Sequence, residues 1–124
     1  MGIEKQVIRE GNGVCPQKHD EVSMEYTGWL YDESKADKKG NQFDSSVGRG
    51  DLVTEIGVGR VIRGWDEGIL GTSGSAPMSL GEKATLIITP DYGYGARGFH
   101  GFIPPNAMLV FDVELKAING QSAS

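Results

Sequence analysis

The clearest pattern along the chain is an alternation of apolar and polar positions. It occurs in residues 22–27, 84–88 and 109–116, and more weakly in 3–9 and 51–56. Successive side chains of a strand point to opposite faces, so this pattern predicts strands with one buried and one solvated face. Strands of this kind are typical of an antiparallel sheet.

One segment has the spacing of a helix instead. Val61, Trp65 and Ile69 are four residues apart, which places them on one face of a short helix near 62–70. Two glycines within it each lower the helix propensity by about 1 kcal/mol. Only packing against a sheet would therefore hold this helix. The predicted fold class is α+β, an antiparallel sheet with one short helix across a face.

Two polar segments are predicted to be surface loops. Residues 32–42 are polar apart from Ala36, and residues 71–77 offer nothing to bury. The 124 residues contain no internal repeat and no linker. We therefore expect one domain over 1–120 and a disordered tail over 121–124.

Composition and charge restrict the classes of partner. Hydrophobic residues make up 38% and charged residues 23%, as in soluble globular proteins. The net charge of −5 argues against a nucleic-acid backbone or an anionic membrane as partner. No apolar run approaches the roughly 20 residues of a membrane span, and the N-terminus does not look like a signal peptide. We expect a cytoplasmic protein.

Several kinds of reactive site are disfavoured. The single cysteine, Cys15, excludes an intrachain disulfide and a cysteine-based zinc site. His19 and His100 lack metal-ligand spacing, and no serine has the context of a hydrolase nucleophile. Residues 93–98 match G-x-G-x-x-G, but the following 99–105 cannot form the helix that a dinucleotide site requires. We expect neither a metal nor a cofactor.

Six short motifs occur in order along the chain. They are Tyr26-Thr27-Gly28, Phe43-Asp44-Ser45-Ser46, Val61-Ile62-Arg63-Gly64-Trp65, Pro90-Asp91-Tyr92-Gly93-Tyr94-Gly95, Ile103-Pro104-Pro105 and Leu109-Val110-Phe111-Asp112-Val113-Glu114-Leu115. Together they resemble the FKBP family, the immunophilins that bind tacrolimus and rapamycin. The family match that they suggest spans about residues 5–118. The pattern is most similar to small, single-domain, cytosolic members of the kind found in fungi.

The resemblance implies a fold, an activity and partners. The fold would be a half-open antiparallel β-sheet of about five strands wrapped around one short α-helix, with a pocket between them. The activity would be peptidyl-prolyl cis–trans isomerisation of X-Pro bonds in peptides and proteins. The alternative is a proline-recognising binding module whose catalysis is incidental. The implied ligands are tacrolimus or rapamycin, with calcineurin or the TOR kinase as drug-dependent partners of a monomer.

The resemblance also implies the residues of the pocket. Phe43, Asp44 and Tyr94 would be the catalytic residues, with Asp44 and Tyr94 as a polar rim. Trp65 would be the floor, and the backbone N–H of Ile62 would bind a carbonyl of substrate or drug. The full set of residues expected to bind substrate or drug is Tyr26, Phe43, Asp44, Leu52, Val61, Ile62, Trp65, Tyr94, Phe99, Ile103 and Phe111.

Two of these positions depart from the family pattern, and other interpretations remain open. Leu52 stands where relatives usually have an aromatic, and Phe99 where many have histidine. From the residues alone, Trp65 is as well explained as a core residue, and Asp44 as the cap of a turn. Arg49 is a candidate contact for a drug-dependent partner.

The chain also differs in length from the family pattern at three places. Residues 33–41 and 71–77 are interpreted as insertions. One residue is absent between Ser46 and Leu52.

Overall fold

The structure is a computed structural model that describes residues 2–122. All five expected strands are present: β1 (Ile3–Arg9), β2 (Glu21–Tyr31), β4 (Leu52–Glu55), β5 (Lys83–Ile88) and β6 (Leu109–Ile118). Two further strands are β3 (Lys39–Ser45) and β7 (Gln121–Ser122). The helices are α1 (Arg63–Leu70) and a short 3₁₀ turn, η1 (Pro90–Tyr92).

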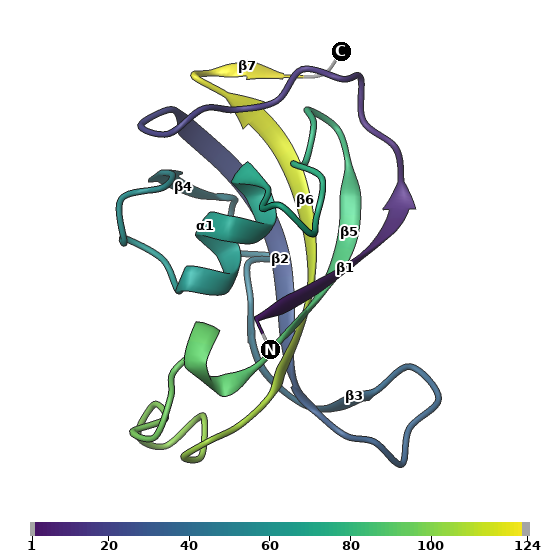
Figure 1. Cartoon of the computed structure of the whole chain (residues 1–124), viewed down its shortest axis with the longest axis vertical. Coiled ribbons are helices and arrows are strands. Elements are labelled where there is room, and N and C mark those ends of the chain that lie inside the picture. Colours follow the sequence, from purple (N-terminus) through teal and green to yellow (C-terminus); the bar gives the residue numbers. More distant parts are fainter. Residues whose placement is uncertain (1, 123–124) are drawn as a thin grey trace.

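The strands form one antiparallel sheet that curves around α1. Its order is β1-β5-β6-β2-β3, with β4 also pairing with β2 and β7 with β6. The long strands β2 and β6 run side by side through its middle, and α1 lies across the concave face (Figure 1). The predicted α+β fold, a half-open sheet around one short helix, is confirmed.

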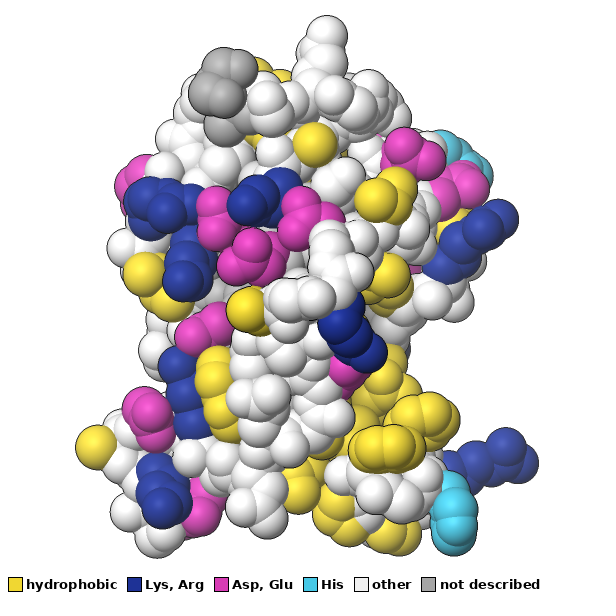
Figure 2. Space-filling model, turned by 180° about the vertical axis from the view of Figure 1, so that it is seen from behind, with side chains coloured by type: hydrophobic (Ala, Val, Ile, Leu, Met, Phe, Trp, Pro, Cys, Tyr) yellow, Lys and Arg dark blue, Asp and Glu magenta, His cyan; other side chains and the backbone are white. Residues whose placement is uncertain are grey.

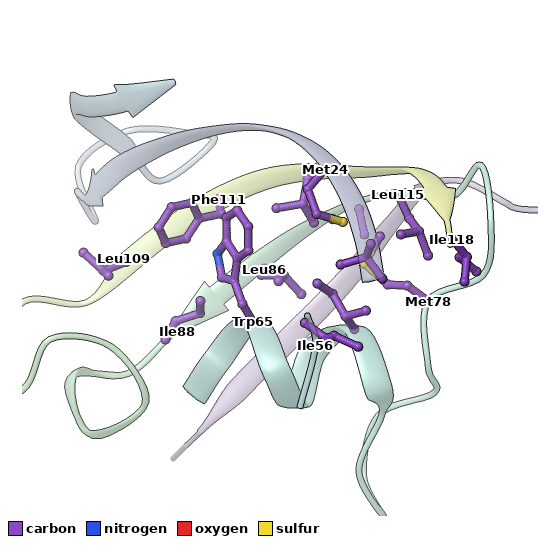
Figure 3. Close-up of a cluster of buried hydrophobic side chains, with 14 of the residues drawn as sticks. Met24, Ile56, Trp65, Met78, Leu86, Ile88, Leu109, Phe111, Leu115 and Ile118 are labelled. Carbon is purple, nitrogen blue, oxygen red and sulfur yellow. The ribbon is translucent and has the colours of Figure 1, made fainter. Parts of the chain in front are cut away.

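The core lies between α1 and the sheet. In β5, every second residue is buried, and in β6 the buried Phe111, Val113 and Leu115 alternate with Asp112 and Glu114. The inward side chains of β2, β5 and β6 meet Trp65 and Ile69 of the helix in one apolar cluster (Figure 3). The period of two in the sequence therefore identifies the side of each strand that faces the helix.

The outer face of the sheet is charged. Arg9 of β1 pairs with Glu114 of β6 (2.6 Å) across the intervening β5, and Lys39 of β3 pairs with Asp112 of β6 (2.8 Å) across β2. Lys116 of β6 pairs with Glu25 of the adjacent β2 (3.6 Å). Positive and negative side chains are interspersed over the back of the molecule (Figure 2).

Helix α1 begins at Arg63, so Val61 precedes the helix and does not share its buried face. This corrects the prediction that Val61, Trp65 and Ile69 form one helical stripe. The buried residues of α1 are Gly64, Trp65, Gly68 and Ile69. A Cβ placed on Gly64 would lie 2.7 Å from the Cδ1 and Cγ2 atoms of Ile88. A glycine that weakens the isolated helix thus allows α1 to sit directly on β5.

One loop prediction also needs correction. Residues 39–42 belong to β3, whereas a surface loop was expected over 32–42. This polar strand pairs with β2, and the Nζ atom of Lys39 lies 4.4 Å from the ring centroid of Trp29. Backbone pairing and a cation–π contact therefore hold a segment that has no buried apolar stripe.

Three further predictions concern the C-terminal tail, the 71–77 loop and the segment after Gly98. Gln121 and Ser122 pair with β6, although they were expected to belong to a disordered tail. Residues 123–124 of that tail lie outside the described residues. The 71–77 loop lies mostly on the surface, and no helix follows Gly98 in the segment up to β6.

Replacing Gly64 with alanine tests the close contact between α1 and β5. We expect Gly64→Ala to lower the free energy of unfolding by about 1–2 kcal/mol. Overpacking costs about 1–3 kcal/mol, which exceeds the roughly 1 kcal/mol that alanine gains in helix propensity. Urea unfolding measures the difference. The control is Gly74→Ala, since a Cβ there meets nothing within 4 Å. Equal losses in the two variants would contradict the packing argument.

Candidate functional site

A cavity of about 450 Å³ opens beside α1. Its lining comes from β2, β3, β4, β6, α1, the loop before α1 and the segment after η1. It contains nine of the eleven residues that the family resemblance implies: Tyr26, Phe43, Asp44, Leu52, Val61, Ile62, Trp65, Tyr94 and Phe111. Gly59 and Arg60 complete the lining and were not predicted.

The floor and one wall of the cavity are aromatic rings packed edge to face. The ring centroid of Trp65 lies 5.0 Å from that of Tyr26 and 5.4 Å from that of Phe111, with interplanar angles of 79° and 86°. Phe43 meets Phe111 at 5.5 Å and 90°. Trp65 reaches from α1 toward Phe111 (Figure 3). Since T-shaped contacts are a preferred ring geometry, these walls are rigid.

Trp65 is both a core residue and the floor of the cavity, which are the two interpretations that the sequence left open. Its side chain is a core residue with only 3% of its surface exposed, and it also lines the cavity. Its indole Nε1 is buried and has no hydrogen-bond partner among residues 2–122. The floor of the cavity is therefore also part of the hydrophobic core.

A glycine in β2 makes room for the wall. A Cβ on Gly28 would lie 2.6 Å from Cε1 of Phe111 and 2.8 Å from Cζ of Phe43. Both rings therefore pack over the strand only because this position lacks a side chain. The Tyr26-Thr27-Gly28 motif thus supplies one aromatic wall and the space for two others.

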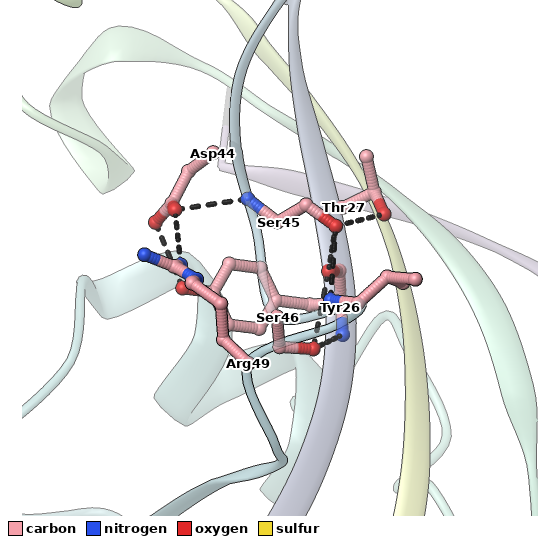
Figure 4. A network of polar contacts seen from close by, with 7 residues as sticks. Tyr26, Thr27, Asp44, Ser45, Ser46 and Arg49 are labelled. Atoms are coloured by element: carbon pink, nitrogen blue, oxygen red, sulfur yellow. Dashed lines mark hydrogen bonds and ion pairs between the residues drawn. The ribbon is translucent and has the colours of Figure 1, made fainter.

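The polar rim is organised by Asp44. Its Oδ2 accepts a hydrogen bond from the hydroxyl of Tyr26 (2.8 Å), and its Oδ1 accepts from Nη2 of Arg49 (2.7 Å) and from the backbone N–H of Ser45 (2.9 Å) (Figure 4). The bond from Ser45 joins adjacent residues within β3 and is therefore not the cap of a turn that the sequence left open. The other two join β2, β3 and the following loop around one carboxylate.

Two tyrosines of the cavity are held in the neutral form. Burial raises the pKa of Tyr26 to about 12. The hydrogen bond to Asp44 and the negative charge of the Asp44 carboxylate act in the same direction. Burial and the charge of Asp44 also raise the pKa of Tyr94 above its usual value. At neutral pH both phenols are therefore hydrogen-bond donors, and neither is a base.

Phe99 and Ile103 do not line this cavity. They line an adjoining hollow of about 280 Å³, together with Arg49 and Phe102 and with three residues shared by both: Phe43, Asp44 and Tyr94. The rings of Tyr94, Phe99 and Phe102 are stacked in succession, 5.8 Å and 5.6 Å apart. Phe99 is 53% exposed and Phe102 59% exposed. The hollow is thus an apolar extension of the rim.

One backbone donor at the cavity is unused. Ile62 directly precedes α1, and its carbonyl accepts the N–H of Trp65 at 2.9 Å. Its own N–H donates to no other group within the described part of the chain. A hydrogen-bond donor is therefore available on a residue that lines the cavity.

A wider hollow of about 690 Å³ lies between β1 and residues 74–77, and its one lysine, Lys5, is already paired with Glu82. Lys5 Nζ lies 2.9 Å from Oε2 of Glu82, and Oε1 of Glu82 accepts the N–H of Ser79 at 3.0 Å.

Within 2–122, no three His, Cys, Asp or Glu side chains come together as a metal site would need. No helix in that range is long and apolar enough to cross a bilayer. The aromatic cavity is therefore the better candidate site.

Replacing Asp44 with asparagine tests the origin of the Tyr26 shift. We expect Asp44→Asn to lower the pKa of Tyr26 from about 12 toward its ordinary value of 10, because a charged acceptor is lost. The shift should not vanish, since burial is its largest cause. Tyrosine Cζ chemical shifts followed against pH measure it, with Asp91→Asn as control. An unchanged Tyr26 titration would contradict the assignment.

The raised pKa of Tyr26 also predicts how stability depends on pH. Below pH 10, Tyr26 is neutral in both the folded and the unfolded chain. Between about pH 10 and 12, the unfolded chain loses the proton and the folded chain keeps it, so this contribution to stability is lost.

Known proteins share these features. Residues 13–116 match the model of the FKBP-type peptidyl-prolyl cis-trans isomerase family. The chain is 61% identical over 118 residues to FK506-binding protein 1 of Gibberella zeae, which covers 95% of this chain and 99% of the relative. It is 57% identical over 125 residues to a peptidyl-prolyl cis-trans isomerase of Schizosaccharomyces pombe, covering 99% and 100%.

A solved structure agrees with the sequence comparison. The crystal structure of AtFKBP13 superposes with a TM-score of 0.82 at 38% identity, covering 97% of this chain and 93% of that one. The family resemblance of the six motifs is thus confirmed, and fungal relatives are among the similar proteins. The chain belongs to the FKBP-type peptidyl-prolyl cis–trans isomerases.

Proposed function

We propose that the cavity above Trp65 is where this isomerase holds proline while the preceding peptide bond rotates. The observation that carries the proposal is a rigid aromatic box, fixed by edge-to-face contacts, with one free backbone N–H at its lining. In this proposal Phe43, Asp44 and Tyr94 position the substrate, and Trp65 supports the pyrrolidine ring.

The reaction requires shape and desolvation more than reactive groups. Amide resonance sets a barrier of about 18–20 kcal/mol to rotation, and uncatalysed X-Pro isomerisation takes tens to hundreds of seconds. Reaching milliseconds needs about five decades of rate, or roughly 7 kcal/mol. No covalent bond is broken, so a nucleophile is not needed.

An apolar cavity favours the transition state of this rotation. The twisted amide has lost resonance, so its carbonyl oxygen carries less negative charge than in the planar ground state. Moving the bond out of water therefore costs the planar form more than the twisted form. The aromatic walls supply this environment and restrict the ring, which adds a positioning effect.

The polar groups would orient the backbone on either side of proline. We assign the free N–H of Ile62 to a substrate carbonyl and the hydroxyl of Tyr94 to a second one. Asp44 acts mainly through others, because Tyr26, Ser45 and Arg49 already occupy its oxygens. None of these groups needs to exchange a proton.

We further propose that tacrolimus and rapamycin occupy the same cavity. The support is that similar fungal proteins are named FK506-binding proteins, FK506 being tacrolimus. Calcineurin or the TOR kinase would then be the partner of the drug-bound form, with Arg49 and the exposed Phe99 and Phe102 at the edge of the drug. A cytoplasmic monomer remains our expectation.

Three substitutions test the catalytic assignment. Phe43→Leu, Asp44→Ala and Tyr94→Phe should each lower kcat/KM for an X-Pro peptide by about 3- to 30-fold, as expected when about 0.5–2 kcal/mol of contact energy is lost. Protease-coupled or NMR exchange assays measure this. Tyr31→Phe is the matched control, because Tyr31 does not line the cavity. Unchanged rates in all three variants would exclude the site.

Trp65 reports ligand binding independently of turnover. In a Trp29→Phe background, tacrolimus should change the emission of Trp65 and should also stop acceleration of the X-Pro peptide. A saturating drug that leaves the spectrum unchanged would contradict the placement of the ligand. Drug binding without any acceleration by the free protein would instead indicate a proline-binding module.

A further inference from the structure

The two charged side chains that line the cavity differ in how fully they are paired. These residues are Asp44 and Arg60. Asp44 is held by three donors. Within residues 2–122 the one ion-pair contact of Arg60 is a long one, to Glu55, and 66% of its side chain is exposed. Arg60 is thus a cation on the cavity wall whose guanidinium donors are available.

The nearest carboxylate holds Arg60 only loosely. Its Nη2 lies 3.8 Å from Oε1 of Glu55, which is beyond hydrogen-bond distance. Oε2 of the same Glu55 lies 2.7 Å from Nδ1 of His19, so this carboxylate already has a closer partner. A carboxylate from a ligand can therefore compete for Arg60 with little to displace.

Arg60 and the aromatic extension lie at different parts of the site. The residues shared between the cavity and the adjoining hollow are Phe43, Asp44 and Tyr94, whereas Arg60 lines only the cavity and Phe99 only the hollow. A peptide whose proline lies in the cavity can thus leave toward stacked rings on one side. Arg60 lines the cavity away from these rings, since it does not line the hollow that holds them.

We propose that Arg60 makes this isomerase prefer substrates with Asp or Glu on one side of the proline. The inference rests on the proposed function of the cavity. A guanidinium group offers a fork of donors that matches a carboxylate. The chain as a whole has a net charge of −5 and repels acidic peptides, so the preference must come from this local contact. For an exposed pair we expect about two- to fivefold in kcat/KM.

The experiment uses two matched pairs of Leu-Pro peptides. One pair carries Glu or Gln before the Leu-Pro unit, and the other carries Glu or Gln after it. In the wild-type protein we expect the Glu peptide to exceed the Gln peptide by about threefold in kcat/KM at one of the two positions. The ratio should approach one in 1 M NaCl, where the screening length is about 3 Å.

Variants assign the preference to Arg60. Arg60→Gln should bring the Glu/Gln ratio to about one, and Arg60→Glu should take it below one. Glu55→Gln should raise the ratio, because it removes the competing carboxylate. Lys116→Gln is the matched control: it removes the same charge from the outer face of β6 and should leave the ratio unchanged.

Three outcomes would overturn the proposal: a ratio of one at both positions in the wild type, a ratio that persists in Arg60→Gln, or an equal loss in Lys116→Gln. Urea unfolding of each variant shows whether it is folded. Failure of the proposed function would appear separately, as Gln-peptide rates that Phe43→Leu, Asp44→Ala and Tyr94→Phe leave unchanged.

Discussion

The edge-to-face packing of Trp65 against Tyr26 and Phe111 is the interaction on which the rest of the structure depends. Helix α1 has eight residues, fewer than the roughly 12–15 that an isolated helix needs to be stable. Burial of Trp65 and Ile69 against the sheet must therefore supply its stability. The same indole is the floor of the cavity, so the contact that seats the helix also builds the site. A change that loosens one loosens the other.

A carboxylate beside this apolar cavity is tolerated because its neighbours satisfy it. A carboxylate removed from water without partners would be costly, and 42% of the Asp44 side chain stays exposed, which makes this cost small. Tyr26 on β2, Arg49 in the following loop and the backbone of Ser45 offset the part that remains. The network also ties β2 to β3 at the point where Phe43 enters the wall. Polar pairing and aromatic packing therefore fix the same corner of the cavity.

The strands that the sequence predicted most clearly are those that bury a stripe of side chains, as β2, β5 and β6 do, while β1 and β4 gave a weaker pattern. The strand β3 was missed because Lys39 holds it through Trp29 and Asp112, which are distant in sequence, and because polar residues fill it. The family resemblance placed nine residues at the cavity, but the order of motifs along the chain does not tell which loop residues share one hollow. The loop that carries Phe99 and Ile103 places them at the adjoining hollow and not at the cavity. Arg60 was missed because it belongs to no apolar pattern.

Because the reaction breaks no bond, catalysis depends on the apolar walls of the site more than on the charged residues at its edge. Rotation changes the polarity of one amide, but an acidic side chain beside the proline keeps its charge throughout. Its attraction to Arg60 is therefore equal in the ground state and in the transition state, which is uniform binding and acts on KM and not on kcat. An exposed arginine at this position can therefore alter which prolines are reached without disturbing the desolvated aromatic box that accelerates rotation. Selection of substrate and catalysis of rotation are in this way assigned to different residues of one cavity.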